Sequence, residues 1–115
     1  MNKRATTKKY CLLFSTTGSQ EEASRIASHL VENHLVACVN IVPSIRSVYW
    51  WNDQVNDESE SLLLMKTEKS KIKEVEIAIK SIHSYETPEL IAVGLDYGMP
   101  AYLGWISTAV RKSKK

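Results

Sequence analysis

The sequence is poor in the residues that mark several specialised classes of protein. Its 115 residues include only 2 cysteines, 3 prolines and 4 glycines. Two cysteines are too few for the disulfide framework of a small secreted domain. The sparse glycines form no phosphate-binding loop, no dinucleotide fingerprint and no Gly-x-Ser-x-Gly motif, so the sequence points away from an enzyme. No apolar run approaches the ~20 residues of a membrane-crossing helix, and the run 10–14 is too short for the core of a signal peptide.

The sequence also lacks a large excess of charge of one sign. The charges are nevertheless distributed unevenly along the chain. The formal net charge is +2, from 15 Lys and Arg against 13 Asp and Glu. Eight of the basic residues lie in two tails without acids, 1–9 and 111–115, so the single domain expected at 10–110 carries a net charge of −6. An acidic body repels phosphate, so we expect neither a nucleic acid nor a membrane as partner. The basic tails are interpreted as solubilising ends.

Both cysteines are expected to be free. Cys11 and Cys38 each lie among apolar residues in a strand-like stretch. This context favours buried thiols in a reducing compartment, which predicts a cytoplasmic protein. Neither has a basic residue beside it in the sequence that would activate it, so neither is expected to be a nucleophile.

Hydrophobic periodicity predicts four strands and three helices. The first helix is expected to start at Ser19, in capping-box spacing with Glu22, and to stop at Asn33. Its apolar stripe includes Val31, and the stripe of a second helix, starting at 67 or 70, runs from Ile72 to Ile82. The third helix is expected to begin at Pro100, and the strands at 10–16, 35–51 with an interruption at Pro43-Ser44, 59–67 and 90–95, with a hairpin turn at 51–54.

This order of elements predicts an α+β fold, a ferredoxin-like βαββαβ sandwich with a C-terminal helix and both main helices on one face of the sheet. A sheet with an open face should alternate apolar and polar side chains. The runs 62–65 and 48–51 instead place apolar side chains on both faces. Such an exposed patch would be unusually large for a monomer, so we expect other subunits of the same chain to cover it.

The segment 83–89 is the strongest candidate for a metal site. It places His83 and Glu89 in a loop after the second predicted helix, and imidazole with carboxylate suits copper or zinc. The alternative is a histidine at a helix C-terminus beside solvated glutamates. His29 and His34 have no partner at ligand spacing and are expected to face solvent. The acidic residues around the hairpin lack the EF-hand pattern and are interpreted as a solvated turn; they are Asp53, Asp57, Glu58 and Glu60.

Five segments together resemble the CutA family of divalent-cation tolerance proteins. They occur in order between Leu12 and Ile106, at 35–43, 47–51, 64–67, 83–90 and 102–106. The resemblance implies a ferredoxin-like subunit in a compact homotrimer, related in architecture to the PII signalling proteins. It also implies a role in tolerance to copper and other divalent cations.

In the family, copper binding is attributed to a Cys at the end of the first strand and to a His and a Glu of the later loop. By resemblance the His is His83 and the Glu is Glu89, whereas the Cys position holds Ser15. A hydroxyl is a poor ligand for Cu(I), which prefers thiolate. The chain also departs from the family at three further positions, which are Ile82 for a second His, Ser84 for the usual Pro, and Met99 for a helix-capping residue.

Two functions from different classes are therefore expected. The first is a non-enzymatic homotrimer that binds copper or another divalent cation through His83 and Glu89. The second is a PII-like trimeric signalling or scaffold module, which binds a small ligand or a partner protein in the clefts between subunits.

Overall fold

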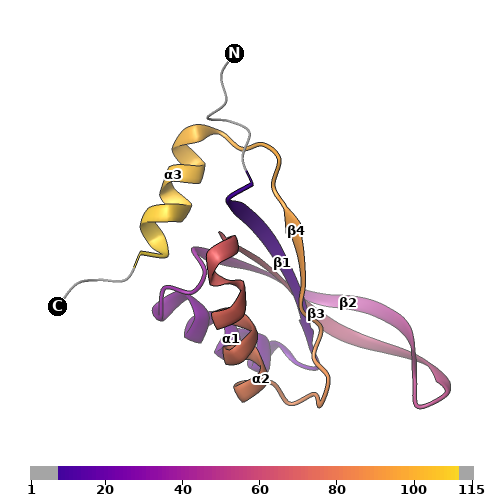
Figure 1. Cartoon of the computed structure of the whole chain (residues 1–115). Coiled ribbons are helices and arrows are strands. Elements are labelled where there is room, and N and C mark those ends of the chain that lie inside the picture. Colours follow the sequence, from indigo (N-terminus) through magenta and orange to yellow (C-terminus); the bar gives the residue numbers. More distant parts are fainter. Residues whose placement is uncertain (1–7, 112–115) are drawn as a thin grey trace.

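The structure, a computed structural model, describes residues 8–111 and confirms the α+β architecture. Four strands form one antiparallel sheet, and three helices pack against it (Figure 1). Most of the two basic tails predicted at 1–9 and 111–115 lies outside the described residues. Along the chain the elements are β1 (Tyr10–Thr17), α1 (Gln20–Glu32), β2 (Cys38–Trp51), β3 (Gln54–Glu68), a 3-10 turn (Lys69–Lys71), α2 (Ile72–Ile82), β4 (Ile91–Gly94) and α3 (Pro100–Ala109).

The strand order is β2-β3-β1-β4, as the ferredoxin-like arrangement predicts. Side chains alternate between the two faces of the central strand β1. Cys11 and Leu13 are fully buried under α1 and α2, whereas Leu12 and Phe14 are half-buried on the opposite face. The two faces of the sheet therefore differ, one being covered by helices and the other largely open.

The main core lies between the sheet and the helices α1 and α2. It joins Ile26 and Leu30 of α1 to Val75 and Ile79 of α2, over the strand residues Leu63 and Met65. The periodicity of both helices is thus confirmed in their middle turns. Val31 and Ile82, expected in the buried stripes, are instead 38% and 37% exposed. Each lies in the last turn of its helix at the edge of the stripe, because Leu30 and Ile79 of the same turns are buried.

The hairpin formed by β2 and β3 is longer than predicted and extends away from the helices (Figure 1). Asn52 and Asp53 make a two-residue turn with φ of 54° and 59°, the left-handed conformation of a type I′ hairpin. The expected interruption at Pro43-Ser44 is confirmed as a register shift. Strand β3 begins at Gln54 rather than 59. Residues 54–58 were not predicted as strand, because polar residues on a hairpin exposed on both faces show no apolar alternation.

Helix α1 begins and ends where the sequence predicts. The Ser19 hydroxyl accepts a hydrogen bond from the Glu22 amide at 3.1 Å, and Asn33 is the C-cap. The following residue, His34, has φ of 59°, and its Nδ1 donates to the carbonyl oxygen of Ala109 at 2.9 Å. The expectation that His34 faces solvent is therefore wrong, because this bond ties the end of α1 to the end of α3.

Two boundaries differ from prediction around the sheet. Strand β3 continues to Glu68, and α2 begins at Ile72 after a 3-10 turn, rather than at 67 or 70. Residues 35–37 precede β2 instead of belonging to it, although Leu35 and Val36 are buried in the core. Burial without strand pairing explains why their apolar character suggested a strand.

Helix α3 covers one end of the open face. Leu103, Ile106 and Val110 pack against Tyr10, whose hydroxyl lies 2.6 Å from Ser107 Oγ. The rest of this face remains uncovered in the single chain, where Ile91 is 55% and Val93 49% exposed. Within residues 8–111, no helix is long and apolar enough to span a bilayer.

Candidate functional site

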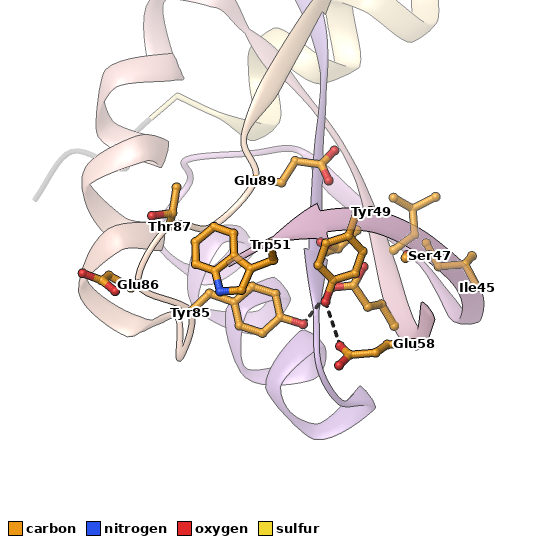
Figure 2. Close-up of a pocket in the computed structure, with 12 residues that line it drawn as sticks. Ile45, Ser47, Tyr49, Trp51, Glu58, Tyr85, Glu86, Thr87 and Glu89 are labelled. Carbon is orange, nitrogen blue, oxygen red and sulfur yellow. Dashed lines mark hydrogen bonds between the residues drawn. The ribbon is translucent and has the colours of Figure 1, made fainter. Parts of the chain in front are cut away.

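A pocket with a volume of about 650 Å³ lies on the open face, where the β2–β3 hairpin meets the loop between α2 and β4 (Figure 2). Because side chains alternate along a strand, every second residue of each strand faces it. The hairpin supplies Ile45, Ser47, Tyr49 and Trp51 from β2 and Glu58, Glu60 and Leu62 from β3, β1 supplies Thr16, and the loop supplies Tyr85, Glu86, Thr87 and Glu89.

The pocket is acidic without a compensating base. Four glutamates line it, and none of the described lining residues is Lys, Arg or His. Glu60 is only 7% exposed and accepts a hydrogen bond from the Tyr85 hydroxyl at 2.7 Å. Glu58 accepts a similar bond from the Tyr49 hydroxyl at 2.8 Å. These hydroxyls hold two carboxylates in place but leave their negative charge unbalanced.

The electrostatic character of the pocket is visible in the pKa of its groups. Burial and the hydrogen bond to Glu60 raise the pKa of Tyr85 far above its ordinary value. Partial burial of the Glu89 carboxyl raises its pKa, and the charge of Glu60 adds to this effect. A hydrogen bond from Thr16 acts in the opposite direction on Glu89. A cation that enters the pocket would relieve the repulsion between these carboxylates.

His83, the predicted metal ligand, does not line this pocket. Its side chain is fully buried, with Nε2 2.7 Å from the carbonyl oxygen of Thr16 and Nδ1 3.0 Å from the amide nitrogen of Tyr85. A carbonyl can only accept and an amide N–H can only donate, so Nε2 donates to Thr16 and Nδ1 accepts from Tyr85. Both ring nitrogens are therefore occupied, and metal binding would require breaking one of these bonds.

The loop is anchored to α1 through Glu22. This carboxylate is 5% exposed and accepts hydrogen bonds from the Ser84 amide at 2.6 Å and from the Ser84 hydroxyl at 3.0 Å. A proline at position 84 would have no N–H to donate. Glu22 thus completes only half of the predicted capping box, because its side chain turns to the loop rather than back to Ser19.

Ser15, which stands at the Cys position of the family, does not join a metal site. It is 1% exposed, and its Oγ has no hydrogen-bond partner among the described residues. It alternates with Thr16, so it points toward the helices while Thr16 points into the pocket. Within residues 8–111, no three His, Cys, Asp or Glu side chains are grouped to hold a metal. His83 and Glu89 as metal ligands therefore remain a prediction, to which Ser15 adds no thiolate.

Glu58 and Glu60 are the site residues that the sequence interpretation missed. They were expected in a solvated turn, which is wrong for the buried Glu60. The signal that identifies them is the spacing of Glu58, Glu60 and Leu62 at every second position, typical of one face of a strand. The expected inertness of Cys11 agrees with the structure, since burial raises the pKa of its thiol despite nearby Lys69.

Known proteins resemble the chain over nearly its whole length. Protein CutA 1, chloroplastic, of Oryza sativa is 36% identical over 98% of this chain and 64% of its own length. The divalent-cation tolerance protein CutA of Archaeoglobus fulgidus is 40% identical over 85% of this chain and 95% of its own. The chain therefore spans just under two thirds of the rice relative but nearly all of the archaeal one.

Solved structures share the fold. The crystal structure of CutA1 from Oryza sativa superposes with a TM-score of 0.88 at 34% identity, covering 96% of this chain and 99% of the other. The structure of the periplasmic divalent cation tolerance protein CutA from Archaeoglobus fulgidus gives 0.86 at 37% identity, covering 89% and 99%. The names of these relatives refer to more than one compartment, the chloroplast and the periplasm.

A family model identifies the same relationship independently of any single relative. The model described as CutA1 divalent ion tolerance protein matches residues 11–109. This description names tolerance to divalent ions. The match spans β1 to α3, and the chain belongs to the CutA1 divalent ion tolerance protein family.

Proposed function

We propose that this protein is a non-enzymatic homotrimer that binds divalent cations in the acidic pocket, with Glu89 as a ligand. The observation that carries the proposal is the uncompensated charge of the pocket, which four glutamates line without a Lys, Arg or His. Carboxylates at partly buried positions attract a cation because its charge replaces their mutual repulsion. The membership of the CutA1 divalent ion tolerance family supports this assignment.

A trimer is part of the proposal because a single chain leaves both the open face and the cation site incomplete. The half-exposed Ile91 and Val93 of β4 pair with Phe14 and Leu12 of β1, which forms an apolar patch across the sheet. A second copy would remove this patch from water. Because no three potential ligands are grouped within residues 8–111, neighbouring subunits or water must complete the coordination of a bound ion.

The donor atoms favour a hard cation over copper. The pocket offers carboxylate and hydroxyl oxygens, which suit Mn²⁺, Mg²⁺ or Ca²⁺, whereas Cu(I) prefers thiolate. His83 would add a nitrogen ligand only if its ring left Thr16 or Tyr85. We therefore keep Glu89 as the proposed ligand, and His83 as a ligand remains a prediction that titration can test.

Isothermal titration with Mn²⁺ and with Cu²⁺ tests the proposal on the full-length protein. Glu89→Gln should weaken Mn²⁺ binding, since it removes one carboxylate and keeps the shape of the side chain. Glu76→Gln is a matched control, because Glu76 lies on α2 outside the acidic pocket. Unchanged Mn²⁺ affinity in Glu89→Gln would contradict the proposal. A loss of Cu²⁺ binding in His83→Gln, with Mn²⁺ binding intact, would identify His83 as a copper ligand.

The second candidate, a PII-like module for a small ligand, is favoured by the size of the pocket. A volume of about 650 Å³ is far larger than an ion needs and lies in the range of small-molecule sites. In a trimer, this pocket on the open face would lie beside a neighbouring subunit. A thermal-shift screen distinguishes the candidates, because stabilisation by organic ligands but not by metals would favour the second.

A cytoplasmic location completes the proposal. It rests on the free thiols of Cys11 and Cys38, which suit a reducing compartment. Fractionation of the source cells tests it, since recovery of the protein with periplasmic or organellar markers would overturn the assignment.

A further inference from the structure

We propose that the acidic pocket binds an organic ammonium ion, with Tyr49, Trp51 and Tyr85 forming its aromatic wall. This inference shares the acidic pocket with the proposed function but concerns a different class of ligand. Figure 2 shows the three aromatic side chains projecting among the glutamates that line the pocket. Aromatic faces together with carboxylates are the combination that recognises quaternary and other alkylated ammonium groups.

The distribution of the carboxylates supports a large cation. They lie on different elements, with Glu58 and Glu60 on β3 and Glu89 in the loop before β4, and they are not grouped as metal ligands within residues 8–111. A small inorganic ion needs several oxygens in direct contact, so water or a neighbouring subunit must complete its coordination here. An ammonium ion with methyl groups spreads its charge over a larger surface, so separated carboxylates can attract it without touching it.

The two tyrosines are held in a defined orientation for this purpose. Tyr49 donates its hydroxyl proton to Glu58, and Tyr85 donates to Glu60, so each ring is fixed at its outer end. The backbone of Tyr85 is also fixed, because its amide donates to His83 Nδ1. Rings that are already ordered lose little conformational entropy when a ligand binds.

Trp51 supplies the most informative test because its neighbour provides a matched control. Trp51 lines the pocket, whereas Trp50 projects from the opposite face of the same strand and is 74% exposed. Exchanging either indole for Ala removes the same chemical group from the same hairpin. Only one of the two changes alters the pocket.

Choline is a suitable probe, with its neutral isostere 3,3-dimethylbutan-1-ol as a control for apolar binding. Titration of the full-length protein should show binding of choline and much weaker binding of the alcohol. Trp51→Ala should weaken choline binding by about two- to thirtyfold, the range for one cation–π contact. Trp51→Phe should retain part of the affinity, and Trp50→Ala should leave it unchanged. Circular dichroism confirms that each variant is folded.

Several results would overturn the inference. These are no choline binding at millimolar concentration, equal binding of the neutral alcohol, or equal losses in Trp50→Ala and Trp51→Ala. Vesicles of phosphatidylcholine separate a free ammonium ligand from a lipid headgroup. We expect no retention on them, because an acidic pocket disfavours the adjacent phosphate, and retention would overturn the assignment to a free ligand.

A parallel Mn²⁺ titration separates this inference from the proposed function. Trp51→Ala should leave Mn²⁺ binding unchanged, because an indole supplies no metal ligand. Choline binding without Mn²⁺ binding would contradict only the proposed function. Mn²⁺ binding without choline binding would contradict only the ammonium site.

Discussion

The loop 83–89 lines part of the pocket and is hydrogen-bonded to the N-terminal end of α1 through single residues. Glu22 is buried and accepts two hydrogen bonds from Ser84. The residues on either side of Ser84 are also joined, because the Tyr85 amide donates to His83 Nδ1. A buried carboxylate that loses its donors is costly, because no water replaces them. The departure from proline at position 84 therefore has a structural role in this chain.

Ser84→Pro should lower the free energy of unfolding by about 1–3 kcal/mol, since Glu22 would lose both of its donors. His83 has φ of −80° and ψ of 143°, a conformation that a following proline permits, so backbone strain adds little. Ser84→Ala is the control, because it keeps the amide and removes only the hydroxyl. Urea unfolding measures both variants. Equal stability of the proline and alanine variants would contradict a role for the amide.

Glu89 makes stability depend on pH in an unusual direction. Its pKa is raised in the folded protein above the ordinary value of 4.5, mainly by burial. As pH rises through the interval between the unfolded and folded values, the unfolded state loses its proton first, so stability falls. Wild type should lose stability relative to Glu89→Gln over this interval. Denaturant titrations between about pH 4 and 7 measure the difference, and a parallel pH dependence of the two proteins would refute it.

At the scale of elements, α3 is joined to the sheet by a polar contact as well as by apolar packing. Ser107 Oγ donates to Glu68 Oε2 at 2.5 Å and lies within hydrogen-bond distance of Tyr10. The N-terminal end of α3 is less well held, because Met99 occupies the N-cap position and its side chain makes no capping hydrogen bond. The first-turn amides of the helix thus receive no side-chain cap, although Pro100 favours the helix start.

Met99→Asp should raise the free energy of unfolding by about 0.5–2 kcal/mol, as a side-chain oxygen at the N-cap accepts from the first-turn amides. Met99 is 68% exposed, so its loss removes little packing. Met99→Ala is the matched control, since alanine cannot cap. Thermal unfolding compares the three proteins, and an aspartate variant no more stable than the alanine variant would speak against the capping explanation.

The β2–β3 hairpin exposes several large apolar side chains. On its helix-side face, Val48 is 61%, Trp50 74% and Val55 59% exposed. On its other face it forms one wall of the pocket. The hairpin therefore lines the site with one face and exposes apolar side chains on the other.

At the scale of the whole molecule, the open face predicts self-association, and the family resemblance implies that three subunits take part. Light scattering of the wild type should give three times the 13.0 kDa mass of the chain. Val93→Lys, on the open face, should shift the mass toward the monomer, because it places a charge in the proposed interface. Ile77→Lys is the control, since Ile77 is 67% exposed on α2, away from this face. A monomeric wild type, or dissociation by both variants, would contradict the proposed interface.

The order of elements was predictable because it depends on local patterns. The stripe of α1, the turn at Asn52 and Asp53, and the shift at Pro43-Ser44 each reflect a preference of a few neighbouring residues. Residues 54–58 were not assigned to a strand because neither face of the hairpin is buried there, so no alternation of apolar side chains marks them. Patterns of burial can only reveal elements that bury one face.

The sequence alone identified the family and the antiparallel sheet with its helices. It also showed that apolar residues occupy both faces of the strand at 62–65. It could also identify 83–89 as a chemically active loop. The environment of each side chain depended on tertiary contacts between residues far apart in the chain. Thr16 and Tyr85 occupy the nitrogens of His83, and Ser84 draws Glu22 away from its cap. Glu60 is a buried pocket residue that accepts a hydrogen bond from Tyr85. Hydrogen bonds over such separations have no periodic signal in the sequence, so only folding reveals which donors a residue retains.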